Sequence, residues 1–255
     1  MKKIRVGVIP AAGNGRRIDE LPLTRVLPKP MLPILNKPLL EHSIENMKAM
    51  GVKTVYIIIG HKKEVVKEYF GTGQDWDIEI AYVEQKNPKG IAHAINMVKG
   101  YISEPFMVIL GDDLTITPSF SNLAELFWKN QAWAVEGVVV EKDINALRRA
   151  CCISVNETNK VISIEEKPIM PTSNLRGCGV YLFDPIVFGF IRKTPIIPPK
   201  NEQEITNTLK IMSEYGKVYA PLINGVNVNV NTLEDLLKAT KLLFSTAHDD
   251  KSLLA

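Results

Sequence analysis

Short apolar runs alternate with stretches of helical spacing along the first half of the chain. Leu40, Ile44 and Met47 recur on one helix face, and Gly51 follows as a stop. Valine and isoleucine dominate the apolar runs, as in buried strands. The predicted strands are 4–9, 54–59, 79–83, 106–110 and 134–140, and the other predicted helices are 62–70, 91–98 and 120–130. This alternation predicts an α/β fold with a mostly parallel sheet, helices on both faces and right-handed crossovers.

The pattern changes after about residue 143. A polar cluster at 156–160 separates two apolar runs, 152–155 and 161–165, and predicts a hairpin. Further predicted strands are 178–183, 217–222 and 226–230, and further helices are 205–215 and 232–244. Residues from Ser245 onward are mostly polar and are expected to fray. We expect one domain over 1–245, divided into halves at about 142/143, and a tail over 246–255.

Composition excludes several classes of protein. The chain is 45% hydrophobic and 23% charged, as in ordinary globular proteins, and its net charge of +3 is too small to imply a nucleic-acid partner. No apolar run approaches the roughly 20 residues of a membrane helix, and the N-terminal run is too short for a signal peptide. The cysteines Cys151, Cys152 and Cys178 form no C-x-x-C pair, so reduced thiols in a cytoplasmic protein are expected.

A glycine loop follows the first predicted strand. Ala12, Gly13, Asn14 and Gly15 are small enough for the backbone to approach a ligand, and successive N–H groups can bind phosphate oxygens. The loop is not a dinucleotide fingerprint, because Ile18 stands where a third glycine is needed, and it lacks the P-loop motif. By itself, it is also consistent with a simple tight turn.

The next segment is rich in proline and basic residues. Five prolines stand between positions 22 and 38, which predicts a stiff, non-helical loop. A long loop inside a compact domain is usually functional. This one places Arg16, Arg17, Arg25 and Lys29 near the glycine loop, where they could bind phosphates or form a solvated charged surface.

Together, 12–18 and 22–33 resemble the signature of the sugar-1-phosphate nucleotidyltransferases, A/G-G-x-G-T-R-L followed by P-x-T-x-x-x-P-K-x-x-x-P. The resemblance implies a Rossmann-like, doubly wound, mixed but mostly parallel sheet with a small sugar-side β region. The sequence has no hexapeptide repeats, so we expect no C-terminal β-helix. It makes 1–142 the nucleotide-binding half and 143–245 the sugar-binding half. Arg17 and Lys29 would bind the triphosphate and act in catalysis. Arg16 replaces the usual threonine, and the spacer at 19–21 is longer than in many members.

A second motif follows the third predicted strand. Gln85 can donate to and accept from a pyrimidine edge, and Gly90 can offer backbone atoms to the same base. The segment resembles the Q-x-x-P-x-G-x-A-x-A motif of thymidylyl and uridylyl members, which implies that these residues bind thymine or uracil. The alternative is an ordinary loop before a helix.

The fourth predicted strand leads into Gly111, Asp112 and Asp113. A carboxylate at the carboxyl end of a parallel strand can hold Mg²⁺ against phosphate oxygens, although paired aspartates also occur in structural turns. The motif matches the family's G-D pair, which implies Asp112 as a nucleotide-site metal ligand and Asp113 beside the sugar or ribose. The family's second, late carboxylate is replaced here by Asn229, which we expect to bind Mg²⁺, with Asn231 as the alternative.

The predicted sugar site lies in the second half. Residues 165–168 match the family motif E-E-K-P, which implies that Glu166 accepts hydrogen bonds from sugar hydroxyls and Lys167 neutralises the sugar phosphate. A charged surface segment is the alternative. The backbone around Gly177 would line the same pocket, whereas Cys151 stands where the family usually has a glycine.

The motifs imply an enzyme that transfers a nucleotidyl group from dTTP or UTP to a sugar 1-phosphate, with glucose 1-phosphate preferred and pyrophosphate released. A uridylyl- or cytidylyltransferase for another phosphorylated sugar or alcohol, and a non-catalytic nucleotide-sugar-binding protein, are the alternatives. The implied cofactor is Mg²⁺. Members of the family are often dimers or tetramers, so the resemblance is also consistent with a homo-oligomer. The four histidines do not have the spacing of metal ligands, and we expect each to be structural or at the surface. They are His42, His61, His93 and His248.

Overall fold

The computed structural model describes residues 2–13, 22–198 and 201–252. The strands are β1 Val6–Pro10, β2 Pro33–Ile34, β3 Lys37–Pro38, β4 Thr54–Ile59, β5 Glu79–Glu84, β6 Phe106–Ile109, β7 Asp113–Ile116, β8 Ala134–Val140, β9 Cys151–Val155, β10 Val161–Glu166, β11 Leu175–Phe183, β12 Val218–Tyr219 and β13 Val226–Asn229. The α-helices are α1 Leu39–Ala49, α2 Lys63–Phe70, α3 Ile91–Asn96, α4 Ser121–Lys129, α5 Ile144–Leu147, α6 Val187–Ile191, α7 Ile205–Ser213 and α8 Leu233–Ser252. Short 3₁₀ helices are η2 Pro22–Arg25, η3 Lys29–Met31 and η4 Gln74–Trp76.

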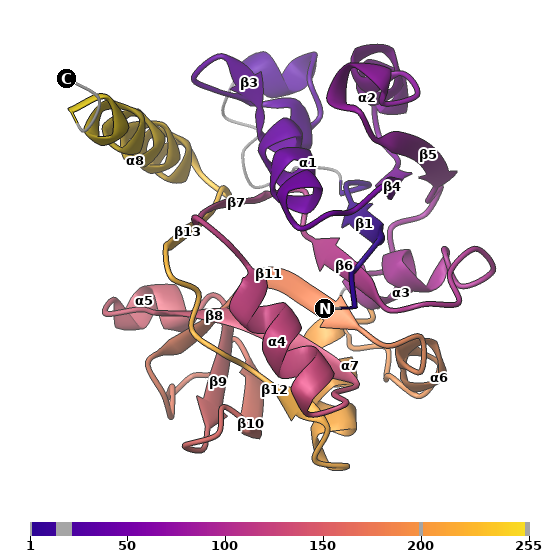
Figure 1. Ribbon diagram of the computed structural model, residues 1–255, viewed down its shortest axis with the longest axis vertical. Coiled ribbons are helices and arrows are strands. Elements are labelled where there is room, and N and C mark those ends of the chain that lie inside the picture. The colour runs from indigo at the N-terminus through magenta and orange to yellow at the C-terminus, as the bar shows by residue number, and fades with distance from the viewer. Residues whose placement is uncertain (1, 14–21, 199–200, 253–255) are drawn as a thin grey trace.

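The main sheet is mixed, as predicted, and runs in the order β10-β9-β11-β6-β1-β4-β5 (Figure 1). The strands β6, β1, β4 and β5 are parallel, whereas β11 is antiparallel to β6. On its other side β11 pairs with β8, which in turn pairs in parallel with β12. A strand from the second half of the chain therefore lies between two strands of the first half.

Helices cover both faces of this sheet and bury an apolar core on each. Side chains of α1, α2 and α4 pack on one face, with Ile44, Phe70 and Phe127 among the buried residues. Helices α3, α6 and α7 pack on the other face, with Ile95 and Leu209 buried. The predicted α/β architecture is confirmed.

A small sheet and the C-terminal helix form a third cluster. Strand β7 pairs antiparallel with β13, and a separate core of leucine, isoleucine and valine joins them to β2 and α8. Helix α8 was expected to end at Phe244, but it continues to Ser252 and extends away from the sheet at the upper left of Figure 1. In this extension the hydroxyl of Thr246 donates to the carbonyl of Leu242 one turn earlier.

A buried arginine holds the small sheet to the main one. Arg176 of β11 donates to the side chain and to the backbone carbonyl of Asn227, both at 2.9 Å, and forms an ion pair with Glu141 at 3.3 Å. Asn227 donates in turn to the hydroxyl of Thr115 in β7. These contacts fix β13, and with it the late asparagines, beside the end of β6. No helix among the described residues is both long enough and apolar enough to cross a membrane.

Candidate active site

The loops after β1, β4 and β6 meet at the carboxyl ends of these parallel strands. The amide of Ala11 donates to the carbonyl of Ile58 at 2.8 Å, and the amide of Gly111 donates to the carbonyl of Pro10 at 3.1 Å. A Cβ at Gly111 would lie only 2.9 Å from that carbonyl oxygen, so the close approach of the two loops requires glycine. Ligands of open α/β sheets bind at this edge.

The start of the predicted phosphate loop lies at the same edge. Ala12 is buried against Gly60, and Gly13 is exposed. The predicted residues Asn14, Gly15 and Arg17 lie outside the described part of the chain.

Lys29 is the centre of the polar contacts at this edge. The 3₁₀ helix η3 buries the lysine to 9% exposure, and its ammonium group donates to Asp112 at 2.7 Å and to the side-chain oxygen of Asn231 at 2.8 Å. Asp112 follows β6 and keeps 35% of its side chain exposed. Residues from three distant parts of the sequence therefore meet at one cationic group.

Asn229 and Asp113 continue this network. The two residues are paired across the β7–β13 ladder, and a hydrogen bond from Asn229 lowers the pKa of Asp113. Burial and the neighbouring Asp112 outweigh that effect and the charges of Arg176 and Lys29, so the pKa of Asp113 lies well above its ordinary value. Asn231 also donates to the side-chain oxygen of Asn229. Asp112 is thus the accessible carboxylate of the pair, and Asp113 is the buried one.

The donor set at this point fits magnesium. Asp112 offers a partly exposed carboxylate, and Asn229 and Asn231 offer amide oxygens, which are hard ligands of the kind Mg²⁺ binds. Among the described residues no group of three or more His, Cys, Asp and Glu side chains could hold a metal. Mg²⁺ at Asp112 would therefore need oxygens from a bound phosphate, as is usual for this ion.

Gln85 and Gly90 flank the same edge beyond β5. Gln85 is buried and its side chain lies 2.7 Å from Nδ1 of His93, whose pKa is lowered by burial and by Lys89. A neutral His93 can accept from the Gln85 amide, which fixes the orientation of that amide. Gly90 has φ 95° and packs on Gln203, where a Cβ would lie 2.4 Å from the carbonyl oxygen. His93, expected to be structural, thus contacts a predicted base-binding residue.

The predicted sugar residues gather around β10 and β11. Glu166 accepts from the Lys167 ammonium at 2.6 Å and from the Thr206 hydroxyl at 2.8 Å. Lys167 has φ 49°, a strained backbone that often marks functional sites. Cys151 pairs with Glu166 across β9 and β10, and Gly177 lies close to Cys151. The structure therefore brings Glu166, Lys167 and Gly177 together.

Sequence reasoning missed two buried charges near the site. Arg176, described above, and Glu136 of β8 are both almost fully buried. The sequence carried a signal for Glu136, which is the one charged residue of the predicted strand 134–140. Arg176 lies before the predicted strand 178–183, beside polar residues, so no such signal marked it.

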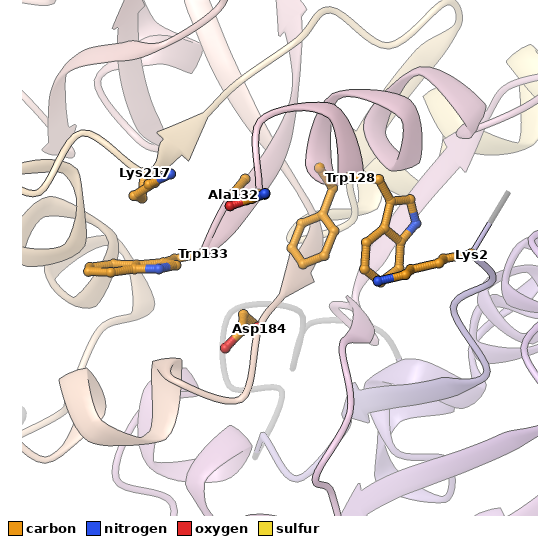
Figure 2. Close-up of a pocket in the computed structure, with 8 residues that line it drawn as sticks. Lys2, Trp128, Ala132, Trp133, Asp184 and Lys217 are labelled. Atoms are coloured by element: carbon orange, nitrogen blue, oxygen red, sulfur yellow. The ribbon is translucent and has the colours of Figure 1, made fainter.

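A surface pocket of about 590 Å³ lies elsewhere. Trp133, Asp184, Lys217 and Lys2 are among the residues that line it (Figure 2). Trp133 and Lys217 directly precede β8 and β12, and Lys2 comes before β1, so the pocket lies where these parallel strands begin. The pocket therefore lies at the amino ends of the parallel strands, whereas Asp112 lies at their carboxyl ends.

Comparisons with known proteins identify the family of this chain. The family model described as nucleotidyl transferase matches residues 6–245. The low-salt glycan biosynthesis nucleotidyltransferase Agl11 of Haloferax volcanii is 31% identical over 97% of this chain and 67% of its own length. The UTP–glucose-1-phosphate uridylyltransferase of Staphylococcus epidermidis is 30% identical over 94% of this chain and 92% of its own. The chain spans 55% of the bifunctional protein GlmU of Methanocaldococcus jannaschii, at 32% identity over 95% of this chain.

Solved structures show the same fold over nearly the whole chain. A UDP-glucose pyrophosphorylase complexed with UDP-glucose superposes with a TM-score of 0.85 at 28% identity, covering 95% of this chain and 99% of that one. A putative glucose-1-phosphate thymidylyltransferase from Bacillus anthracis, in complex with sucrose, superposes with a TM-score of 0.83 at 27% identity. The match covers 93% of this chain and 94% of that one. The chain belongs to the nucleotidyl transferase family and is a sugar-phosphate nucleotidyltransferase.

Proposed function

We propose that this chain transfers a nucleotidyl group from dTTP or UTP to glucose 1-phosphate and releases pyrophosphate. The observation that carries the proposal is the meeting of Lys29, Asp112 and the late asparagines at one point. The substrates named for the uridylyltransferase and thymidylyltransferase relatives support the same pair.

The proposed reaction needs no covalent intermediate. The phosphate oxygen of the sugar attacks the α-phosphorus in line, and pyrophosphate leaves, so positioning and charge neutralisation supply most of the catalysis. Lys29 would exchange its contact with Asp112 for the triphosphate, and Arg17 would bind the same phosphates. Lys167 would leave Glu166 to pair with the sugar phosphate.

Asp112 would hold Mg²⁺, helped by an amide oxygen of Asn229 or Asn231. When bound, the ion would supply positive charge that neutralises the negative charge developing on the phosphates. Gln85, oriented by His93, would hydrogen-bond the pyrimidine base beside the backbone of Gly90.

The test is pyrophosphate release with Mg²⁺ for dTTP, UTP, CTP, GTP and ATP, each against glucose 1-phosphate and other sugar phosphates. Turnover with dTTP or UTP and glucose 1-phosphate is expected. Turnover with CTP or GTP alone would discard the role of Gln85 and keep the reaction class.

One observation favours a second function, a protein that binds nucleotide sugars without turnover. Asn229 stands where the family has a carboxylate, which leaves Asp112 as the accessible acid of this cluster. Folded protein that binds a nucleotide sugar and shows no turnover with any pair would support this alternative.

A further inference from the structure

Glu136 is a buried acid that the proposed reaction does not use. It lies in the middle of β8, between apolar neighbours, with 1% of its surface exposed. Among the described residues, its Oε2 atom has no hydrogen-bond partner. A buried, unpaired carboxyl oxygen is costly, and such atoms in folded proteins call for an explanation.

The position of this carboxyl links it to the predicted sugar pocket. A Cβ built on Gly177 would lie 2.2 Å from Oε1 of Glu136 and 3.4 Å from the Cβ of Cys151. The Glu136 carboxyl therefore fills the space that a side chain at position 177 would occupy. Gly177 and Cys151 are both partly exposed, so Glu136 lies directly behind the surface that these two residues form.

The surroundings of the carboxyl favour a ligand that brings polar hydrogens. The neighbouring charges that act on Glu136, those of Glu166 and Asp113, are both acidic, and they add to burial in raising its pKa to about 8. The Tyr181 hydroxyl hydrogen-bonds to the carboxyl and lowers the pKa only in part. A hydroxyl or amino group of a ligand would supply the missing partner for Oε2.

Glu166 is the charged neighbour that acts most strongly on Glu136, and it stands nearer the surface. This outer acid is 23% exposed at its side chain and accepts from Lys167 and Thr206. When Lys167 turns to a sugar phosphate, one oxygen of Glu166 is released. The binding of a sugar substituent to Glu136 requires the Glu166 side chain to move outward, because Glu136 itself is only 1% exposed.

We propose that Glu136 is a sugar-binding residue whose carboxyl pairs with a hydroxyl or amino group on the side of the sugar that faces Gly177 and Cys151. This rests on the proposed function, because it takes Glu166 and Gly177 as the sugar pocket. The ligand class is a sugar 1-phosphate with a hydrogen-bond donor at that ring position. A site built around such a bond strongly rejects the analogue that lacks the group.

The experiment compares wild type with Glu136→Leu, which removes the hydrogen bond, and Glu136→Gln, which keeps a donor and an acceptor. The substrates are glucose 1-phosphate, its singly deoxygenated analogues and glucosamine 1-phosphate, measured by kcat/KM and by calorimetric Kd. Wild type is expected to reject one deoxy analogue by about 100-fold or more. E136L should lose about 100-fold with the parent sugar and less than about threefold with that analogue, whereas E136Q should stay within about tenfold of wild type for a neutral sugar.

Glucosamine 1-phosphate distinguishes a hydroxyl partner of Glu136 from an ammonium partner. A larger loss in E136Q with glucosamine 1-phosphate than with glucose 1-phosphate identifies an ammonium partner, and an equal loss identifies a hydroxyl. Loss of activity spread equally over all sugars in E136L, or no loss at all, would overturn the proposal.

Failure of the proposed function gives a different result. If wild type turns over no sugar 1-phosphate, that function fails, and the calorimetric Kd values decide the role of Glu136. Discrimination in Kd that E136L abolishes supports the role. Equal Kd values in the three proteins, or no binding of any sugar 1-phosphate by folded wild type, overturn it. Thermal melting of each variant checks that it is folded.

Discussion

Lys29 is the residue on which most of the proposed chemistry converges. Replacement by alanine should lower the turnover rate by roughly a hundredfold or more. The variant loses a preorganised positive charge that would stabilise the negative charge developing on the phosphates during the reaction. Pyrophosphate release under saturating substrates measures the effect.

Lys63→Ala is the matched control for Lys29→Ala. Lys63 forms an ion pair with Glu84 at 2.7 Å on the surface, and such pairs contribute little to stability. Its turnover should stay within about threefold of wild type. A fall smaller than about threefold in Lys29→Ala would remove Lys29 from the catalytic set.

Asn229→Asp should change the magnesium requirement. A carboxylate at position 229 would face Asp113 across the ladder and add negative charge beside Asp112. Half-maximal turnover should then need severalfold less Mg²⁺, because carboxylates are stronger ligands than amides. A magnesium titration of the variant with the same half-maximal concentration as wild type would exclude position 229 from the metal site.

For single residues, the sequence indicated which side chains gather at the carboxyl ends of the strands, but not which of them contact one another. Motifs singled out Lys29, Asp112 and Gln85, and the structure places all three at the carboxyl edge of the parallel strands. The contact of Lys29 with Asn231 joins residues 202 positions apart, which spacing alone cannot reveal. His93 was missed as a partner of Gln85 because a lone histidine on a short helix carries no local signal.

Among the elements, the start of α3 depends on one glycine. Gly90→Ala should lower the free energy of unfolding by about 1–3 kcal/mol, because φ 95° is strained for alanine and the new Cβ would clash with the Gln203 backbone. Urea denaturation measures the change.

Gly100→Ala is the control for this glycine. Gly100 is exposed, and its added Cβ would have no heavy atom within 4 Å. The variant should unfold with a free energy within about 0.5 kcal/mol of wild type or slightly above it. Equal stability in both variants would contradict the clash at Gly90.

Elements with strong periodicity were predicted well, and those formed by distant pairing were not. The limits of β4 and β8 were predicted correctly, and α2, α3, α4 and α7 differ from their predicted ranges by one or two residues at their ends. The short helices α5 and α6 were not predicted. Strand β7 was missed, because its first residue, Asp113, looks like part of a turn and its pairing partner β13 is more than a hundred positions away. The predicted strand 217–222 is only Val218–Tyr219, because the next amide, that of Ala220, donates to the carbonyl of Asn159. Pairing with β8 returns only as a single bridge between Val138 and Leu222.

For the whole molecule, Glu136 should make stability depend on pH. Its pKa is raised from 4.5 to about 8, so the folded state binds the proton more tightly than the unfolded state. This contribution is fully present below pH 4.5 and is lost as the pH rises to about 8, at about 1.4 kcal/mol per pH unit.

Glu136→Gln removes that titration and leaves the neighbouring acids in place. The free energy of unfolding of wild type, measured in urea at pH 5 and pH 8, should fall by several kcal/mol relative to the variant at the higher pH. A wild-type-to-variant difference that is the same at both pH values would show that the carboxyl does not titrate in this range.

The overall architecture was predictable from the alternation of strands and helices, but its strand order was not. Nothing local in 175–183 specifies that β11 pairs with β6 and β8 at once. That choice depends on shape and burial over the whole sheet, and it interleaves the two predicted halves.

The place of β11 also bears on how a ribosome makes this protein. Until residue 183 has left the exit tunnel, β6 has a bare edge and β8 has no neighbour to join it to the sheet. Synthesis must therefore pass residue 183 by the length of chain that the tunnel holds before the sheet can be completed, and an unpaired strand edge is prone to aggregation. A nascent chain stalled before this strand should depend on chaperones, and one stalled well after it should resist protease.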